Sequence, residues 1–306
     1  MQTQAGDKNG IIVVSGNMGN LLREEGRLTE ALVSYNNALS LSNELGHRGS
    51  GALCLQAMGD LQAEKGDLPG ALENYRRAMV IQQEVGAKSN YASSLTSEGE
   101  VFRQQGELSR ALKIDQEALT LQQQLGEQES AAESQLALAE VAYDSRKPAE
   151  AEALARRALD EFRAQREPVS EIAAGGLLSR SLLDQGKLSE AQESIIEATR
   201  LAEKTPDAIS RLSLTVDSAY VLAAEKKTVA ARIAARQVST EAQKLGFVRL
   251  CLEASLALGQ IQMRSGGTTE GRVRLQRLEK DARAKGFMLI AQAASRSLLS
   301  PMGLPQ

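Results

Sequence analysis

The stretch GDLPGALENYRRA (residues 66–78) decides the fold of this 306-residue chain, because close variants of it recur along the sequence. The variants are GRLTEALVSYNNA at 26–38, GELSRALKIDQEA at 106–118 and GKLSEAQESIIEA at 186–198. The four copies begin 40, 40 and 80 residues apart, so one unit of 40 residues repeats. A fixed period of this length predicts a solenoid in which each unit stacks on the next one.

The period runs through seven units without an insertion or a deletion. A turn residue recurs at Gly26, Gly66, Gly106, Arg146, Gly186, Lys226 and Gly266. Five positions later a small residue recurs at Ala31, Ala71, Ala111, Ala151, Ala191, Ala231 and Gly271. The first set of positions predicts the bend inside each unit, and the second set predicts a close contact between two helix axes.

Each unit reads as two helices joined by a short turn. In the second unit, SGALCLQAMGDLQAEKG has helical spacing of apolar residues and ends on glycine, which readily takes the positive φ that closes a helix. The next half opens with Pro69, which the first turn of a helix tolerates. Connections of two to four residues force antiparallel neighbours. We therefore expect an all-α solenoid of about seven antiparallel helical hairpins, with residues 287–299 as a C-terminal capping helix.

The domain boundaries follow from the same period. We expect an irregular N-terminus over residues 1–10, one solenoid over 11–300 and a tail over 301–306. The apolar residues make up 42% of the chain, but no run is long enough to cross a membrane, and the N-terminus lacks the features of a signal peptide. The chain has two cysteines in no metal or redox spacing, which indicates a reducing compartment and predicts a cytoplasmic protein.

No catalytic constellation is visible in the sequence. The single histidine, His47, leaves too few partners for a hydrolytic triad or a histidine metal site. The GK at 186–187 lacks the first glycine of a phosphate-binding loop, because Ser181 stands there. We therefore expect a non-enzymatic protein with no cofactor and no metal.

The repeat resembles the tetratricopeptide repeat family. Its pattern of a small residue, then alanine, then an aromatic residue is met by Met58-Gly59, Ala71 and Tyr75. The usual unit has 34 residues, so this chain is similar to the longer form found in kinesin light chains, polarity adaptors and maltose-type bacterial activators. The last repeat also resembles the repeat regions of bacterial multidomain regulators. The resemblance implies a right-handed superhelix whose first helices line a concave ligand-binding face.

Mapping the concave face of the family onto this chain gives the candidate binding residues. They are Asn20, Arg23, Gln56, Asp60, Glu64, Glu100, Arg103, Glu133, Glu140, Tyr143, Asp144, Arg180 and Tyr220. The same face of later units carries Asp184, Val216, Glu253, Gln260 and Arg264. The carboxylate clamp of chaperone-binding repeats is not expected, because Gly16 stands where that clamp needs a lysine.

The candidate residues of units two to four include six acids against one arginine, Arg103. Such a concavity would focus a negative potential and attract a basic partner. The competing interpretation is that these acids are a solvated helix face, and that Arg180 and Asp184 form only an i,i+4 pair. Tyr143 and Tyr220 are interpreted as stacking anchors or equally as wedges between hairpins.

Basic residues gather in the C-terminal half, above all in RVRLQRLEKDARAKG at 272–286. We interpret them as a solvated outer face in preference to a patch for nucleic acid, although the acidic and basic halves also suit head-to-tail self-association. The leading hypothesis is a protein-interaction scaffold that holds a peptide or partner segment in a long, shallow groove. The alternative is a regulatory sensor domain that binds a small effector in a compact pocket.

Overall fold

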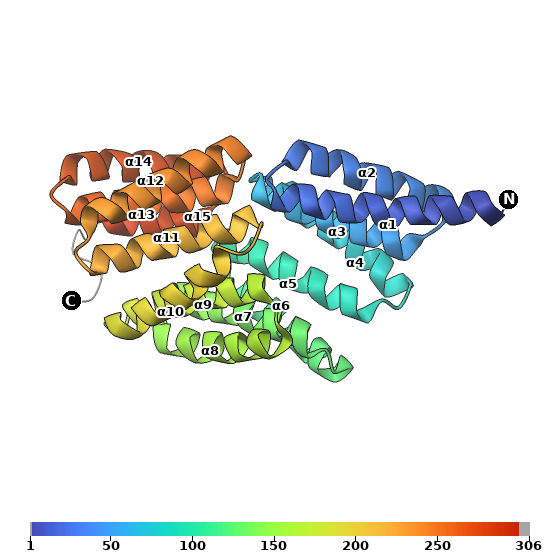
Figure 1. The fold of residues 1–306 in the computed structure, drawn as a ribbon, viewed down its shortest axis with the longest axis horizontal. Coiled ribbons are helices and arrows are strands. Elements are labelled where there is room, and N and C mark those ends of the chain that lie inside the picture. Colours follow the sequence, from blue (N-terminus) through green and yellow to red (C-terminus); the bar gives the residue numbers. More distant parts are fainter. Residues whose placement is uncertain (1, 300–306) are drawn as a thin grey trace.

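The structure is a computed structural model that describes the backbone of residues 2–299 and the side chains from residue 8 onward. This part contains fifteen α-helices and no strand, which confirms an all-α repeat solenoid (Figure 1). The first helices of the seven hairpins are α1 (Gln2–Glu24), α3 (Arg48–Glu64), α5 (Lys88–Gln104), α7 (Gln128–Asp144), α9 (Pro168–Leu183), α11 (Ala208–Ala224) and α13 (Val248–Arg264). The second helices are α2 (Leu28–Leu45), α4 (Leu68–Glu84), α6 (Leu108–Leu125), α8 (Pro148–Gln165), α10 (Leu188–Ala202), α12 (Thr228–Leu245) and α14 (Thr268–Ala284), and the capping helix is α15 (Met288–Leu299).

The bend inside every hairpin takes a left-handed backbone conformation at the position that the period marks. Five of the seven bends use glycine, with φ between 75° and 85°. The other two use Arg146 and Lys226, both with φ of 63°, a conformation that costs a residue with a Cβ about 1–2 kcal/mol. The repeat geometry is therefore kept even where the sequence does not supply glycine.

The small residue near the end of each first helix makes room for a side chain of the second helix. A Cβ added at Gly59 would lie 2.5 Å from Cε1 of Tyr75, and the Tyr75 hydroxyl donates a hydrogen bond of 2.8 Å to Asp60. The first hairpin repeats this arrangement with Gly19, Tyr35 and Asn20. The tyrosine ring is thus packed inside its own hairpin, because glycine has left the space for it.

Helix α1 begins at Gln2, whereas the sequence pattern suggested irregular chain up to residue 10. Within the added turns, Lys8 forms an ion pair with Glu44 in the last turn of α2. The N-terminal end of α1 extends beyond α2 (Figure 1). The expected tail, residues 301–306, lies outside the described residues.

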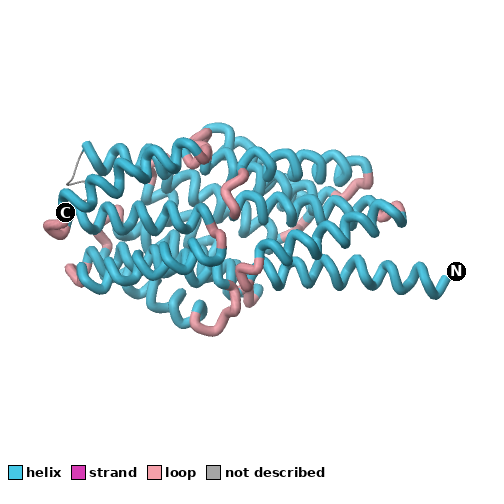
Figure 2. The backbone as a smooth tube through the Cα atoms, turned by 90° about the horizontal axis from the view of Figure 1, so that it is seen from above, coloured by secondary structure: helices cyan, strands magenta, loops and turns pink. Residues whose placement is uncertain are grey.

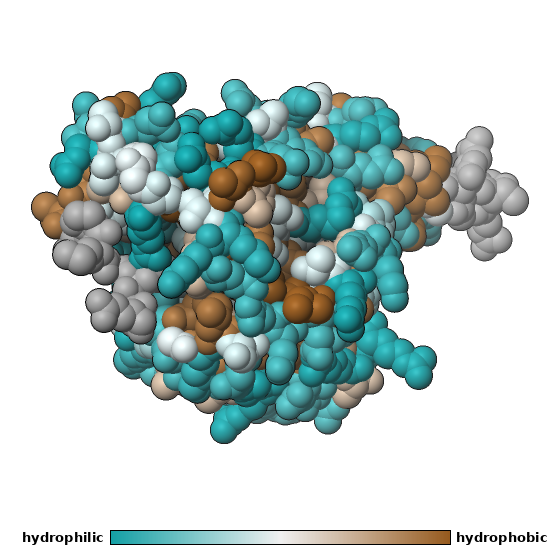
Figure 3. Space-filling model, turned by 60° about the vertical axis from the view of Figure 1, so that its left-hand side comes forward, coloured by the Kyte–Doolittle hydropathy of each residue, from teal (hydrophilic) through white to brown (hydrophobic). Residues whose placement is uncertain are grey.

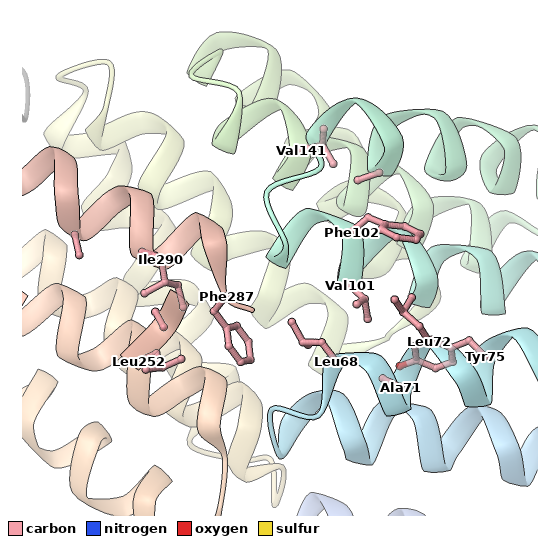
Figure 4. Packing of buried hydrophobic residues seen from close by; sticks show 14 of the residues in the cluster. Leu68, Ala71, Leu72, Tyr75, Val101, Phe102, Val141, Leu252, Phe287 and Ile290 are labelled. Atoms are coloured by element: carbon pink, nitrogen blue, oxygen red, sulfur yellow. The ribbon is translucent and has the colours of Figure 1, made fainter. Parts of the chain in front are cut away.

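The solenoid closes on itself, so that the early hairpins contact the last ones. Helix α13 packs on α3, and α15 packs on α5. Leu68, at the start of α4, is fully buried in one apolar cluster with Phe287, which precedes the capping helix (Figure 4). A second cluster joins Leu28 of the first hairpin to Phe247 of the seventh. Figure 2 shows several loops between helices gathered near the middle of the molecule.

The bends of the first three hairpins form this closure because they expose backbone without side chains. The side chain of Leu245 lies over Gly26, that of Val248 over Gly66, and Met288 lies against Gly106. The face drawn in Figure 3 is mainly hydrophilic, with separate apolar patches. None of the helices in the described part has both the length and the apolar character of a membrane span.

Candidate binding cavity in the lumen of the solenoid

Closure of the solenoid leaves a cavity of about 510 Å³ at its centre, here called the lumen cavity. Its walls come from the first helices α5, α7, α9, α11 and α13 and from the capping helix α15. The second helices contribute no lining residue, because they form the outer layer of the solenoid. The cavity has the size of sites for small ligands, which are about 300–1,000 Å³.

Six of the candidate residues from the sequence line the lumen cavity, and they come from the third to the sixth hairpin. They are Arg103, Glu140, Tyr143, Asp144, Arg180 and Tyr220. Glu253, Gln260 and Arg264 of the seventh hairpin join them.

Arg103 is the centre of an ion network between α5 and α7. Its guanidinium lies 2.6 Å from Glu100 and 3.1 Å from Glu140, and it also pairs with Asp144. Burial opposes ionisation of Glu100, but Arg103 outweighs burial and lowers the pKa of this carboxyl. Burial instead raises the pKa of Glu140 to about 7. The acids of this region are thus held largely by one arginine.

The two lumen tyrosines make different contacts. The guanidinium of Arg180 lies over the ring of Tyr143, 4.9 Å from its centroid, and Arg180 also pairs with Asp217 at 3.0 Å. The Tyr220 hydroxyl donates a hydrogen bond of 2.9 Å to Gln260, whose amide donates to Ser297 in the capping helix. Both rings therefore border the cavity while held by the protein itself.

The remaining candidate residues lie away from the lumen cavity. Glu100 lies behind Arg103, and Glu133 is exposed near the start of α7. Arg23 pairs with Glu64 at 2.7 Å, and burial raises the pKa of Glu64 to about 7. The side chains of three others accept hydrogen bonds from neighbouring repeat residues: Asn20 from Tyr35, Asp60 from Tyr75 and Gln56 from Ser94.

The structure adds lining residues that the sequence pattern did not single out. Arg249 starts α13 and pairs with Glu253 at 2.8 Å, and Asp217 holds Arg180. Arg146 sits at the bend after α7, and Arg296 belongs to the capping helix. The sequence offered a signal for Asp217, because this residue lies in α11, the first helix of the hairpin that follows the hairpin of Arg180. Arg146 and Arg296 had none, because only closure of the solenoid brings the capping helix to the fourth hairpin.

The site offers charge and apolar surface but no metal-binding group. Within the described residues no group of three or more His, Cys, Asp or Glu side chains could hold a metal ion. His47 precedes α3, and Cys54 and Cys251 are unpaired thiols of which the first is buried. The lining of the cavity consists mainly of arginines, carboxylates and apolar side chains.

Comparison with known proteins identifies the repeat. Residues 11–84 match the family model of the tetratricopeptide repeat. The chain has the fold of RapI in its apo form (TM-score 0.66, 13% identity, covering 90% of this chain and 98% of RapI). It is also similar to aspartyl phosphate phosphatase F from Bacillus subtilis, with a TM-score of 0.66 and 13% identity over 93% of this chain and 74% of that chain. A Rap protein complexed with competence and sporulation factor gives a TM-score of 0.61 and 12% identity over 95% of this chain and 97% of that chain.

No curated protein matches the chain in sequence. At 12–13% identity the solved structures share a fold with this chain. The family match covers the first two units, and the same 40-residue hairpin continues through five more. Residues 11–84 are therefore tetratricopeptide repeats, and the chain as a whole has the solenoid fold of the solved structures.

Proposed function

We propose that this protein is a non-enzymatic interaction scaffold that takes a short peptide or partner segment into the lumen cavity. Tetratricopeptide solenoids use their concave surfaces for binding. In this chain the first helices α5 to α13 and the capping helix line a cavity of about 510 Å³, and this observation carries the proposal. One structural relative was solved in complex with competence and sporulation factor, which supports binding as the role of the fold.

The cavity also changes the expected character of the partner. The expectation of a basic partner rested on six acids, but three of them, Glu100, Glu140 and Asp144, pair with Arg103. A fourth, Glu64, pairs with Arg23. A paired carboxylate attracts a cation much less than a free one, so a basic partner is not part of the proposal. We also propose that the ligand is short, because a cavity of about 510 Å³ has the size of a site for a small ligand.

A variant that fills the cavity tests this function. Ala293 of α15 lines the lumen, and Ala293→Trp places a large ring there. Glu193→Trp adds the same ring on the exposed side of α10 and serves as the control. Both variants and the unchanged protein are used to capture partners from an extract of the source cells, with circular dichroism as a check of folding. A partner lost by Ala293→Trp alone supports the lumen as the site.

Retention of every captured partner by folded Ala293→Trp would overturn the proposal and point to the outer surface. The second candidate function is a sensor of a small effector, and the compact size of the cavity favours it. In that case the small-molecule filtrate of the extract raises the melting temperature of the unchanged protein and of Glu193→Trp, but not that of Ala293→Trp. Capture of a protein through the lumen thus supports the scaffold, whereas a filtrate that raises the melting temperature supports the sensor.

A further inference from the structure

The charges of the lumen cavity are unequally paired. Six arginines line it, and three of them hold acids: Arg103 pairs with Glu140 and Asp144, Arg180 with Asp217, and Arg249 with Glu253. These pairs use all the lining carboxylates except one, Asp184. The lining charges that remain unpaired are therefore mainly positive.

Arg146, Arg264 and Arg296 are the three remaining arginines. Among the described residues none of them has an ion pair within 4.0 Å or a side-chain hydrogen bond. They come from three elements: the bend after α7, the last residue of α13 and the middle of α15. Three cations far apart in sequence thus border one cavity.

The arginines lie close enough to influence one another. Burial lowers the pKa of Arg296, and the positive charge of Arg146 lowers it further, while Asp144 opposes the change. Burial also lowers the pKa of Arg264. The negative charge of Asp184 raises the pKa of Arg264, and the positive charge of Arg146 lowers the pKa of Asp184. This single carboxylate offsets only one of the three positive charges. The three side chains remain exposed where they border the cavity, so an anion that entered here would pair with them directly.

The wall beside these arginines is apolar. It is formed by Leu183, Leu256, Met263, Leu289, Ile290 and Ala293. The nearest polar groups, those of Tyr220, Gln260 and Ser297, are already hydrogen-bonded to one another. The cavity thus presents unpaired cations next to a surface that favours burial of apolar atoms.

We propose that the lumen cavity binds an organic anion, with a carboxylate or phosphate head at Arg146, Arg264 and Arg296 and an apolar body against α13 and α15. The proposal rests on the proposed function, since it names the chemistry of the ligand that the lumen accepts. Arginine suits both heads, because its planar fork donates two parallel hydrogen bonds to a carboxylate or a phosphate.

Calorimetric titration with matched probes tests the ligand class. Decanoate and decyl phosphate carry the head and the body, decanol carries only the body, and inorganic phosphate carries only the head. The peptides Ac-LADLA-NH2 and Ac-LANLA-NH2 differ in one charge and represent a partner segment. We expect a ligand with both parts to bind, and its neutral or headless counterpart to bind about tenfold or more weakly. Preference for decanoate, decyl phosphate or the acidic peptide identifies the source of the head.

Arginine variants then test where the anionic head of the ligand binds. The triple change Arg146→Gln, Arg264→Gln and Arg296→Gln should weaken the best probe by about tenfold or more. The control triple, Arg77→Gln, Arg157→Gln and Arg277→Gln, removes the same charge from exposed outer helices and should leave affinity unchanged. An equal loss in both triples would overturn the assignment of the head to these three arginines.

The outcomes separate this inference from the proposed function. If decanol binds as well as decanoate and Ala293→Trp abolishes both, the lumen is a binding site but the anionic head is wrong. If no probe binds while partner capture still depends on an open lumen, the function stands and the ligand class is overturned. If inorganic phosphate binds as well as the amphiphiles, the apolar body is wrong.

Discussion

Asp115 is the residue at which the repeat pattern is broken most clearly. It stands in the third hairpin where Tyr35 and Tyr75 stand in the first two, and it faces Gly99. Its side chain is only 1% exposed, and its Oδ1 has no hydrogen-bond partner within the described residues. Burial raises the pKa of Asp115 to about 8, and the nearby Glu100 adds to the rise. The carboxyl is therefore protonated at neutral pH in the folded protein.

This raised pKa makes stability depend on pH. Between pH 4 and pH 8 the folded state keeps the Asp115 proton and the unfolded state has lost it, so the free energy of unfolding falls as the pH rises. Asp115→Asn removes this term, and we expect a flatter pH profile with greater stability at pH 8. Urea denaturation across this range measures it. Some slope remains, because the pKa of Glu64 and of Glu140 is also raised.

Asp160→Asn, at an exposed position of α8, is the control and should leave the profile unchanged. If Asp115→Asn keeps the full slope of the unchanged protein, the buried carboxyl is not its source.

At the scale of the element, the first two hairpins share a glycine that faces a tyrosine ring. Because Gly59 has no side chain, the ring of Tyr75 lies on the backbone of α3, in what is here called the glycine notch. The hydroxyl of Tyr75 then reaches Asp60. The seventh hairpin uses the same contact with Gly259 and Leu275. In these hairpins the two antiparallel helices interlock at one point, and the approach of their axes depends on the missing side chain.

Gly59→Ala should therefore destabilise the protein by about 1–3 kcal/mol, because its Cβ would overlap the ring of Tyr75. Gly49→Ala in the same helix is the matched control, since nothing lies within 4 Å of its added Cβ. This control should be neutral or should stabilise by up to about 1 kcal/mol. Equilibrium denaturation of both variants makes the comparison. Equal effects of the two alanines would show that the glycine notch has no role in packing.

At the scale of the whole molecule, closure converts an open groove into a cavity. Leu68 and Phe287 bury each other across the two ends of the solenoid (Figure 4). Phe287 and Ile290 also line the lumen cavity, so the same contact that closes the solenoid builds one wall of the site. The candidate site therefore exists only in the closed form.

Leu68→Glu should open the solenoid, because it places a charge in a fully buried apolar contact. We expect a larger radius of gyration in small-angle X-ray scattering, loss of ligand binding in the lumen, and helicity in circular dichroism close to that of the unchanged protein. Leu125→Glu, at a partly exposed residue that ends α6, controls for the added charge. A compact Leu68→Glu variant with full ligand binding would contradict the role of this contact.

The sequence by itself determined the hairpins, their number and the capping helix. These features depend on contacts within one unit or between adjacent units, and such contacts repeat every 40 residues. It also placed six candidate residues at the lumen, since the inner face of each first helix is set by helical periodicity. Two ion pairs had a signal that could have been used: Arg23–Glu64 and Arg103–Asp144 each join residues 41 positions apart, one more than the repeat period, in adjacent units.

Only the tertiary structure decided that the solenoid closes and which charges remain unpaired. The meeting of α3 with α13 and of α5 with α15 depends on the small rotation added by every repeat, and no local pattern in the sequence encodes that sum. The gathering of Arg146, Arg264 and Arg296 at one cavity follows from the same closure. A local pattern determines each hairpin, whereas the accumulated geometry of seven hairpins determines the site.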